Sequence, residues 1–319
     1  SPHLAPGLYD AFGTEEFDDL YLKYEADKTI PKKKVSAQDL FFDLLKERAE
    51  TGRIYIMNLD HCNSHSSFKD KVSMSNLCQE ITLPTTPIQD IHDEQGEIAL
   101  CILSAVNVGA LNDLSELENI CDLSVRALEQ IIDYQDYPVR AAEVSTKKRR
   151  SLGIGYIGLA HYLAKNNVKY SDPKAWELVD RLSEAFQYLL LRASCDIAIE
   201  KGKCEGFERT KYADGLLPID HYKKDVDEIV PHKQRMAWES LRKDIAKYGL
   251  RHSTLSAQMP SESSSVVSNE TNGIEPPRAL LSIKKSKKGP LKQIAPGFPK
   301  LKNDYTLLWD MPNNEGYIN

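Results

Sequence analysis

Three side chains with complementary chemistry lie within residues 76–80. Asn76 carries an amide, Cys78 a thiol and Glu80 a carboxylate. In an extended segment or a loop, residues two apart share a side, so all three can face one cavity. There Glu80 can exchange a proton with a substrate hydroxyl, Asn76 can hold a polar substituent, and Cys78 can supply sulfur chemistry. The alternative from the residues alone is a buried cysteine in an amphipathic strand, which is the commoner case.

A second thiol, Cys101, follows Cys78 by 23 residues and belongs to an apolar run at residues 97–108. Two cysteines on elements that bracket one loop could face each other across a site, or each could fill the core. Six cysteines are too few for a disulfide scaffold in 319 residues, so we expect reduced thiols unless one pair has a redox role. The other four are expected to be packing residues: Cys62, Cys121, Cys195 and Cys204.

Residues 259–265 have the composition of a phosphate-binding loop. Their serine hydroxyls and backbone N–H groups stand between a predicted strand and a predicted helix, and the partial positive charge of a helix N-terminus favours an anion. Arg278, in the turn that follows, is available as a nearby cation. The alternative is an ordinary serine-rich helix cap.

Two other patterns are interpreted as structural. Residues 153–158 match the GxGxxG dinucleotide pattern, but the basic run 147–150 stands where a hydrophobic strand should precede it. We therefore interpret the glycines as packing residues on a buried strand, and the basic run as a solvated surface. His61, Cys62 and His65 suit zinc, yet no distant pair completes a tetrahedral set, so we interpret residues 61–65 as a structural loop and expect no metal site.

The elements that must position these groups alternate between helices and strands. A helix is predicted from Ser36 to Gly52, with Leu40 and Phe41 on its apolar face. Further helices are predicted at 114–134, 159–165, 174–202 and 234–248, strands at 53–59, 97–108, 152–157 and 253–258, and a hairpin between 279–283 and 293–294. Continuous apolar strands indicate burial on both faces, and strands separated by helices indicate βαβ units. We predict an α/β fold that forms one continuous body over residues 1–319.

The composition excludes several classes of protein. With 41% apolar residues the chain can build a core, which excludes disorder throughout. A formal charge of −6 gives no whole-chain signal for nucleic acid or an acidic membrane. No apolar run approaches the roughly 20 residues that span a bilayer, and no secretory leader opens the chain. We expect a cytoplasmic protein that binds neither membrane nor nucleic acid directly, and both chain ends look like cuts through something longer.

Five motifs in the same order closely resemble the large (catalytic, alpha) subunit of class I ribonucleotide reductase. They are residues 75–80 (SNLCQE), 97–101 (EIALC), 150–155 (RSLGIG), 259–262 (MPSE) and 272–278 (NGIEPPR). The resemblance implies a ten-stranded α/β barrel of two half-barrels. This chain would be the second, five-stranded half-barrel, with a central finger loop at about 73–85 and a phosphate loop at about 259–265.

The resemblance also implies a role for each site residue. Cys78 would become a thiyl radical and remove the ribose 3′ hydrogen, Glu80 would deprotonate the 3′ hydroxyl, and Asn76 would hydrogen-bond the ribose hydroxyls. Cys101 would be one of two cysteines that reduce the substrate and end as a disulfide. The substrate diphosphate would be bound by Pro260, Ser261, Glu262, Ser263 and Ser264, with Ser263 in place of the threonine common in the family.

The implied function is thiyl-radical reduction of ribonucleoside diphosphates to deoxyribonucleoside diphosphates for DNA synthesis. The second redox cysteine and the ATP and deoxynucleotide effector sites belong upstream of this sequence, and no adjacent tyrosine pair for a radical relay occurs in it. We therefore expect the isolated chain to be inactive and to bind no cofactor. Its expected partners are the N-terminal part of the large subunit, a metal-containing small subunit that supplies the radical, and a thioredoxin or glutaredoxin type reductant. The alternative is a non-catalytic nucleotide-binding or scaffolding fragment.

Overall fold

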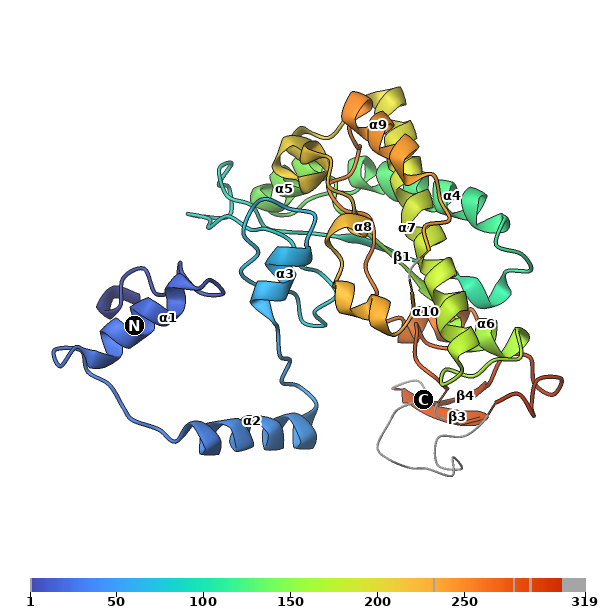
Figure 1. Ribbon diagram of the computed structural model, residues 1–319, viewed down its shortest axis with the longest axis horizontal. Helices are drawn as coiled ribbons and strands as arrows, with labels where there is room; N and C mark the ends of the chain where they lie inside the picture. Colours follow the sequence, from blue (N-terminus) through green and yellow to red (C-terminus); the bar gives the residue numbers. More distant parts are fainter. Residues whose placement is uncertain (1, 232, 278, 287–288, 306–319) are drawn as a thin grey trace. The chain divides into compact units, whose positions relative to one another are not determined.

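The computed structural model describes residues 2–231, 233–277, 279–286 and 289–305 (Figure 1). These residues belong to two compact units. The first unit comprises residues up to 66 together with 71–84, and the second comprises 67–70 together with the chain from 85 onward. The prediction of one continuous body over residues 1–319 stays a prediction.

The first unit consists of short helices joined by irregular chain. They are the 3-10 helix Pro2–Leu4 and the α-helices α1 (Glu16–Ala26), α2 (Ala37–Thr51) and α3 (Leu59–His65). The predicted helix at 36–52 is confirmed as α2. Ser36 caps it by accepting the Asp39 N–H at 3.2 Å, and Gly52 ends it with a left-handed φ of 64°. The predicted strand at 53–59 is wrong, because residues 53–58 pair with no other segment that the structure describes.

The apolar face predicted for α2 is present but unburied. Leu40 is 60% exposed, Phe41 57% and Phe42 58%, and no residue of α2 is buried. Helices of this length draw most of their stability from packing an apolar face against something else. α2 therefore offers a surface that further protein can cover.

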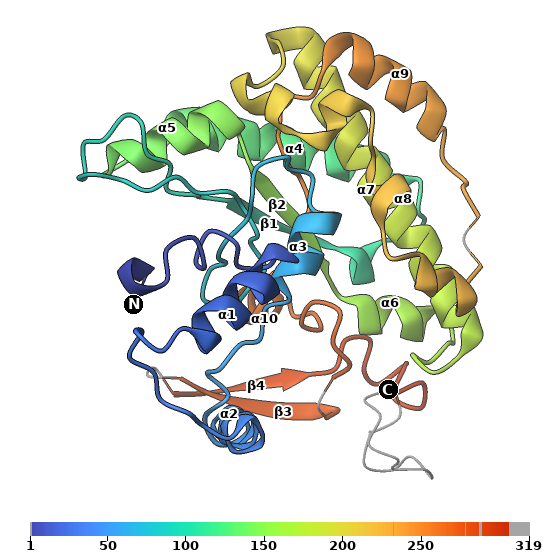
Figure 2. The ribbon, with the colours of Figure 1, turned by 60° about the vertical axis from the view of Figure 1, so that its left-hand side comes forward.

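The second unit is built on two parallel strands, β1 (Ile102–Asn107) and β2 (Leu152–Ile157) (Figure 2). Ile102 pairs with Leu152, and Asn107 with Ile157. The connection between the strands holds the 3-10 helix Val108–Ala110 and the helices α4 (Glu116–Tyr134) and α5 (Arg140–Arg149). The predicted βαβ unit is therefore confirmed.

A third segment runs along the other edge of β2. Thr254 O accepts the Leu152 N–H at 3.0 Å, and Ser256 forms a parallel bridge with Ile154. The predicted strand at 253–258 is thus reduced to one isolated bridge. β2 matches its predicted bounds and is almost wholly buried, whereas β1 is shorter than predicted and Leu103 on it is 40% exposed. Burial on both faces is therefore correct for β2 and wrong for β1.

A layer of helices packs around the two strands and holds the core. α4 packs against α7 (Pro173–Lys201), and α7 packs against α9 (Trp238–Tyr248). The other helical elements are α6 (Leu159–Lys165), α8 (Pro218–His221) and the 3-10 helices Glu205–Arg209, Lys211–Asp214 and Lys224–Glu228. The predicted packing role is confirmed for Cys121, Cys195 and Cys204, which are buried in this core. Burial raises the pKa of Cys121 and of Cys204 to about 12, so both stay protonated and unreactive.

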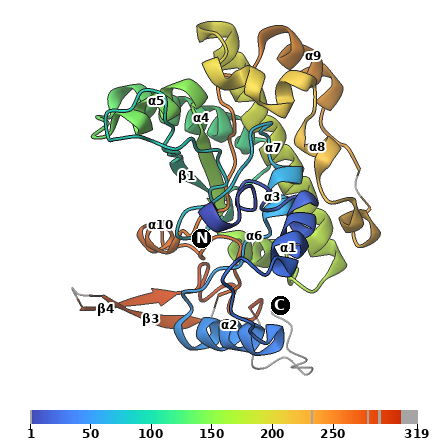
Figure 3. The same ribbon diagram turned by 90° about the vertical axis from the view of Figure 1, so that its left-hand side faces the viewer.

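The second unit continues with α10 (Glu262–Val267), which a hairpin follows. β3 (Leu281–Ser286) pairs antiparallel with β4 (Gly289–Ile294), which confirms the predicted hairpin. α10 lies between the β1–β2 pair and this hairpin (Figure 3). The described residues thus contain two sheets of two strands each.

A buried ionic cluster joins the start of β2 to the helices behind it. Arg150 donates to Glu129 of α4 and to Asp133, each at 2.7 Å, and Arg251 donates to the other oxygen of Glu129 at 2.8 Å. The expectation that the basic run 147–150 forms a solvated surface is wrong for Arg149 and Arg150, which are 2% and 4% exposed. The physical reason is that carboxylates from distant segments pair with both guanidinium groups inside the fold.

His252 completes this cluster as a neutral ring. Burial lowers its pKa although Glu129 opposes the shift. An ionised carboxylate can only accept, so Nε2 carries the proton toward Glu129 at 3.1 Å. Nδ1 then accepts from the Ser194 hydroxyl at 2.9 Å, and that hydroxyl in turn accepts the His252 backbone N–H. Helices α4 and α7 are thereby tied to the segment that leads into 253–258.

Replacing Glu129 with glutamine is expected to lower the free energy of unfolding by about 3–5 kcal/mol, because Arg150 and Arg251 lose a buried counter-charge. Asp133→Asn is the matched control. Its side chain is 50% exposed, so its loss should cost no more than about 1 kcal/mol. Thermal unfolding of both variants measures the difference, and equal losses would contradict the assignment.

The same carboxylate makes stability depend on pH. Burial by itself would raise the pKa of Glu129, but hydrogen bonds from His252, Arg150 and Arg251 outweigh it and lower the pKa to about 2 from an ordinary 4.5. A lowered carboxyl pKa stabilises the fold above the ordinary value, and this stability is lost as the pH falls from about 4.5 toward 2. We expect Glu129→Gln to remove this acid-dependent loss, as measured by melting temperature against pH.

Candidate functional site

The predicted trio lies on a tight turn in the first unit. The Gln79 N–H donates to Asn76 O at 3.2 Å, and Gln79 adopts a left-handed φ of 61°. Of the two predicted conformations, an extended segment or a loop, the structure has the loop, so the strict alternation of sides in a strand does not apply here. The turn places Cys78 between Asn76 and Glu80, which flank it on either side.

Two side-chain hydrogen bonds close the base of this loop. The Ser75 hydroxyl donates to Ile81 O at 2.6 Å, and Asn76 Oδ1 accepts the Ile81 N–H at 3.2 Å. The amide oxygen of Asn76 is thus used to hold the loop. Its NH₂ group contacts no acceptor among the described residues and can donate to a ligand.

The loop exposes its thiol and shields part of its carboxylate. Cys78 is exposed, as is Leu77 beside it, whereas Glu80 is half-buried. Glu80 Oε2 is fully shielded and has no hydrogen-bond partner among the described residues. A shielded acceptor without a donor costs free energy unless a ligand supplies one. The buried-strand alternative for Cys78 is therefore wrong, and one oxygen of Glu80 is shielded without a donor among the described residues.

Cys101 lies in the second unit, directly before β1. It is half-buried, and its Sγ lies 4.0 Å from Ile102 O. All six cysteines are thiols in this structure. Cys78 and Cys101 belong to different units, so a site shared by the two stays a prediction.

The segment leading to Cys101 is anchored by Glu97, a residue to which the sequence assigned no role. Glu97 is 3% exposed and binds Arg149 Nε at 2.5 Å and Lys148 Nζ at 2.9 Å. Burial would raise its pKa, but hydrogen bonds from Arg149 and then Lys148 outweigh burial and lower it. Backbone bonds in both directions between Glu97 and Thr86 complete the anchor. The spacing of residues around Glu97 could not reveal this role, because the two basic residues that bind Glu97 lie about fifty residues downstream.

The predicted phosphate loop forms the start of α10. Ser261 is at the N-cap position, yet its side chain makes no cap hydrogen bond; its hydroxyl donates to Asn272 Oδ1 at 3.0 Å. The alternative of an ordinary serine cap is therefore wrong for Ser261. The first-turn N–H groups of a helix have no partner within it, and the side chains of Glu262, Ser263 and Ser264 are exposed beside them. Arg278, the predicted nearby cation, lies outside the described residues.

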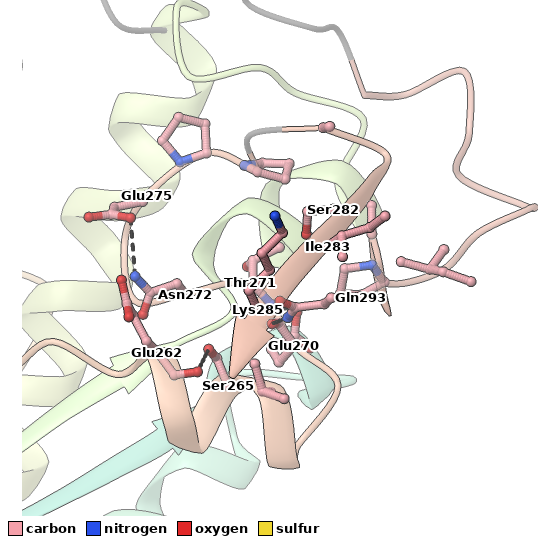
Figure 4. A pocket seen from close by; sticks show the side chains of 17 residues that line it. Glu262, Ser265, Glu270, Thr271, Asn272, Glu275, Ser282, Ile283, Lys285 and Gln293 are labelled. Carbon is pink, nitrogen blue, oxygen red and sulfur yellow. Dashed lines mark hydrogen bonds between the residues drawn. The ribbon is translucent and has the colours of Figure 1, made fainter. Parts of the chain in front are cut away.

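A cavity of about 360 Å³ lies between α10 and the hairpin (Figure 4). Glu262 and Ser265 line it from α10, and Lys285 and Gln293 line it from the hairpin. Glu270, at its floor, binds His161 Nδ1 at 2.9 Å. The helix that carries the loop residues is thus flanked by a cavity with both polar and apolar lining residues.

The other motifs serve structure. The glycines at 153 and 155 lie on β2 in close contact with neighbouring segments, which confirms the packing interpretation. Residues 61–65 belong to helix α3, so the loop interpretation is wrong. Asn63 on α3 donates to Val72 O and accepts the Val72 N–H. In the part of the chain that the structure describes, no three His, Cys, Asp or Glu side chains group as metal ligands. Nor does any helix within those residues have the length and apolarity to cross a membrane.

Comparison with known proteins shows the family to which the chain belongs. The chain matches the family model of the ribonucleotide reductase barrel domain over residues 1–313, and it belongs to this family. It is 58% identical to the ribonucleoside-diphosphate reductase subunit alpha of Buchnera aphidicola subsp. Baizongia pistaciae, and 56% to that of Haemophilus influenzae. It is 54% identical to ribonucleoside-diphosphate reductase 1 subunit alpha of Escherichia coli. The resemblance seen in the sequence is confirmed.

These alignments cover the whole of this chain but a minor part of each relative. They include 42% of the Buchnera protein, 43% of the Haemophilus protein and 42% of the Escherichia protein. The chain therefore spans less than half the length of the curated relatives it matches.

Replacing Glu97 with alanine is expected to loosen the segment that carries Cys101. The change leaves Arg149 buried without this counter-charge, so we expect a loss of about 3–5 kcal/mol in stability and faster alkylation of the Cys101 thiol. Glu94→Ala is the control, because the Glu94 side chain is 71% exposed and its ion pair with Arg140 is a surface contact. Mass spectrometry after brief iodoacetamide treatment measures the rate, and an unchanged rate in Glu97→Ala would contradict the anchoring role.

Proposed function

We propose that this chain is part of the catalytic alpha subunit of a ribonucleoside-diphosphate reductase. The observation that carries the proposal is an exposed thiol on a tight turn, flanked by an amide and a half-buried carboxylate, in a chain of the ribonucleotide reductase barrel-domain family. The reaction would reduce ribonucleoside diphosphates to deoxyribonucleoside diphosphates for DNA synthesis. The names of its relatives support this substrate class.

Each residue of the loop has a role that suits its chemistry. Cys78, as a thiyl radical, takes the ribose 3′ hydrogen, because a thiol hydrogen exchanges with a carbon-bound hydrogen far more readily than a hydroxyl hydrogen does. Glu80 accepts the proton of the 3′ hydroxyl, a role that a carboxylate can perform. The Asn76 NH₂ group donates to a ribose hydroxyl.

Reduction of the ribose requires two electrons, which two thiols supply when they form a disulfide. Cys101 is our proposed member of that pair, and we propose that its partner belongs to the N-terminal half-barrel. The diphosphate is bound at residues 260–264 by first-turn N–H groups and serine hydroxyls. We propose no cofactor in this chain; the radical comes from a separate metal-containing small subunit.

The remaining part of the large subunit is the partner that the structure most directly supports. A thiyl radical has to be shielded from water, yet Cys78 is exposed and α2 presents an unburied apolar face. The chain also spans less than half the length of its relatives. We propose that β1, β2 and the 253–258 segment are part of a five-stranded half-barrel, which the N-terminal half-barrel completes around a finger loop at 73–85. A thioredoxin or glutaredoxin type protein would reduce the disulfide, and reduced thiols suit the cytoplasm.

The test is reconstitution. The chain is mixed with the N-terminal part of the subunit, the small subunit and a dithiol reductant, and reduction of ribonucleoside diphosphates is measured. We expect activity in the complete mixture, none from the chain alone, and a loss of at least about a thousandfold for Cys78→Ala, comparable with removal of a catalytic nucleophile. Cys101→Ala and Glu80→Ala should also be inactive.

Cys62→Ala is the matched control, because this half-buried thiol lies in the same unit as Cys78 but on α3. It should retain activity. An active Cys78→Ala mixture would overturn the assignment. Diphosphate binding without turnover in the complete mixture would instead favour a non-catalytic nucleotide-binding or scaffolding fragment.

A further inference from the structure

Two glycines on β2 lie between the Cys101 thiol and the start of the phosphate loop. Gly153 and Gly155 are two apart on one strand, so they share a face. A side chain on Gly153 would meet Cys101 and Leu103, and one on Gly155 would meet Ala257 and Met259. This face of β2 therefore touches both of the groups that the second unit contributes to the proposed site.

Backbone conformation does not require glycine at either position. Neither residue has a positive φ, so alanine could adopt the same backbone angles. Glycine inside a strand weakens it, because it has a larger entropy loss and no side chain to pack. Space is the remaining reason for two glycines on a buried strand.

At Gly153 the space is occupied by the thiol. A Cβ there would lie 2.7 Å from Cys101 Sγ and 2.6 Å from Leu103 Cδ2, closer than such atoms approach in proteins. The same Cβ would lie 3.0 Å from Ala257 Cβ, so it could not move away from the sulfur toward Ala257. A methyl group at 153 would have to displace the sulfur or the Leu103 side chain.

At Gly155 the space is occupied by backbone. A Cβ there would collide with Ala257 O and would lie 3.1 Å from Met259 Sδ. A carbonyl cannot turn aside as a side chain can, and the Ala257 N–H is bonded to Ile154 O at 3.3 Å. A methyl group at 155 would therefore push the segment 257–259 away from β2, and this segment leads directly into α10.

We propose that Gly153 and Gly155 are positioning residues, the first for the Cys101 thiol and the second for the phosphate loop. The proposal rests on the proposed functions of Cys101 and residues 260–264. The proposal predicts a different kinetic effect for a substitution at each glycine. Gly153 governs the reduction step, and Gly155 governs binding of the substrate diphosphate.

The experiment uses the full-length large subunit with its small subunit, and a ribonucleoside diphosphate as substrate. Gly153→Ala is expected to lower kcat by about tenfold to a hundredfold, since a displacement near 1 Å at a reacting group has effects of that size, with KM unchanged. Gly155→Ala is expected to raise KM about tenfold or more and to leave the alkylation rate of Cys101 unchanged. Gly153→Ala should change that alkylation rate several-fold. If a folded Gly153→Ala subunit has the wild-type kcat and the wild-type rate of Cys101 labelling, the positioning role of Gly153 is overturned. If Gly155→Ala has the wild-type KM, the positioning role of Gly155 is overturned.

Gly206→Ala is the matched control. Gly206 is buried with an ordinary φ. A Cβ there would lie 3.2 Å from Lys148 O and 3.4 Å from Arg149 Cγ, and it would touch neither Cys101 nor residues 257–259. If Gly153→Ala does not fold, the double variant Gly153→Ala/Leu103→Ala removes one obstruction and is compared with Leu103→Ala alone. If Gly155→Ala does not fold, Gly155→Ala/Met259→Ala is compared with Met259→Ala in the same way. Each double variant is expected to show the same kinetic effect as its glycine substitution.

Alkylation of Cys101 is measured without turnover, so it separates the two proposals. An active Cys101→Ala subunit with altered labelling in Gly153→Ala would defeat the proposed redox role and leave the positioning role intact. An inactive Cys101→Ala subunit with wild-type behaviour in Gly153→Ala would defeat the positioning role alone.

Discussion

The second unit depends on buried charges at the junction of α5 and β2. Arg149 and Arg150 stand side by side, and their guanidinium groups bind Glu97 on one hand and Glu129 on the other. Arg150 adopts a left-handed φ of 48°, a conformation that favours glycine, and its ion pairs hold it there. Removing one partner of such a pair leaves a charge in a poor solvent, so the junction has few tolerable alternatives. The start of β2 is thereby fixed against α4 and against the segment that leads to Cys101.

The position of β2 affects both of the functional groups that we propose for the second unit. β2 has β1 on one edge and the 253–258 segment on the other, and each of these neighbours leads to a proposed functional group. Cys101 precedes β1, and the phosphate loop follows 253–258. The glycine face of β2 sets how closely both can approach. Cys101 and the start of the proposed phosphate loop, 158 residues apart in sequence, therefore both lie next to the same strand.

In the first unit, local hydrogen bonds matter more than buried contacts between distant segments. Its helices have local capping signals, such as Ser36 and Gly52 around α2, but little burial. The loop that holds Cys78 is closed by its own hydrogen bonds through Ser75 and Asn76, so its shape needs few distant contacts. The thiol that this loop carries is exposed. An exposed thiol and an unburied apolar helix are features of a surface that further protein can cover.

The sequence by itself determined the identities of the candidate site residues, the family, and every element that has a strong local signal. The α2 caps, the bounds of β2 and α6, the βαβ unit and the hairpin all follow from periodicity and turn chemistry, which act over a few residues. Only the tertiary structure decided that Arg149 and Arg150 are buried, that Glu97 anchors Cys101, that Ser261 bonds to Asn272 rather than capping α10, and that residues 53–58 find no strand partner. The first three depend on partners between 11 and 52 residues away. No local pattern records which distant carboxylate, amide or strand edge the fold will bring into contact.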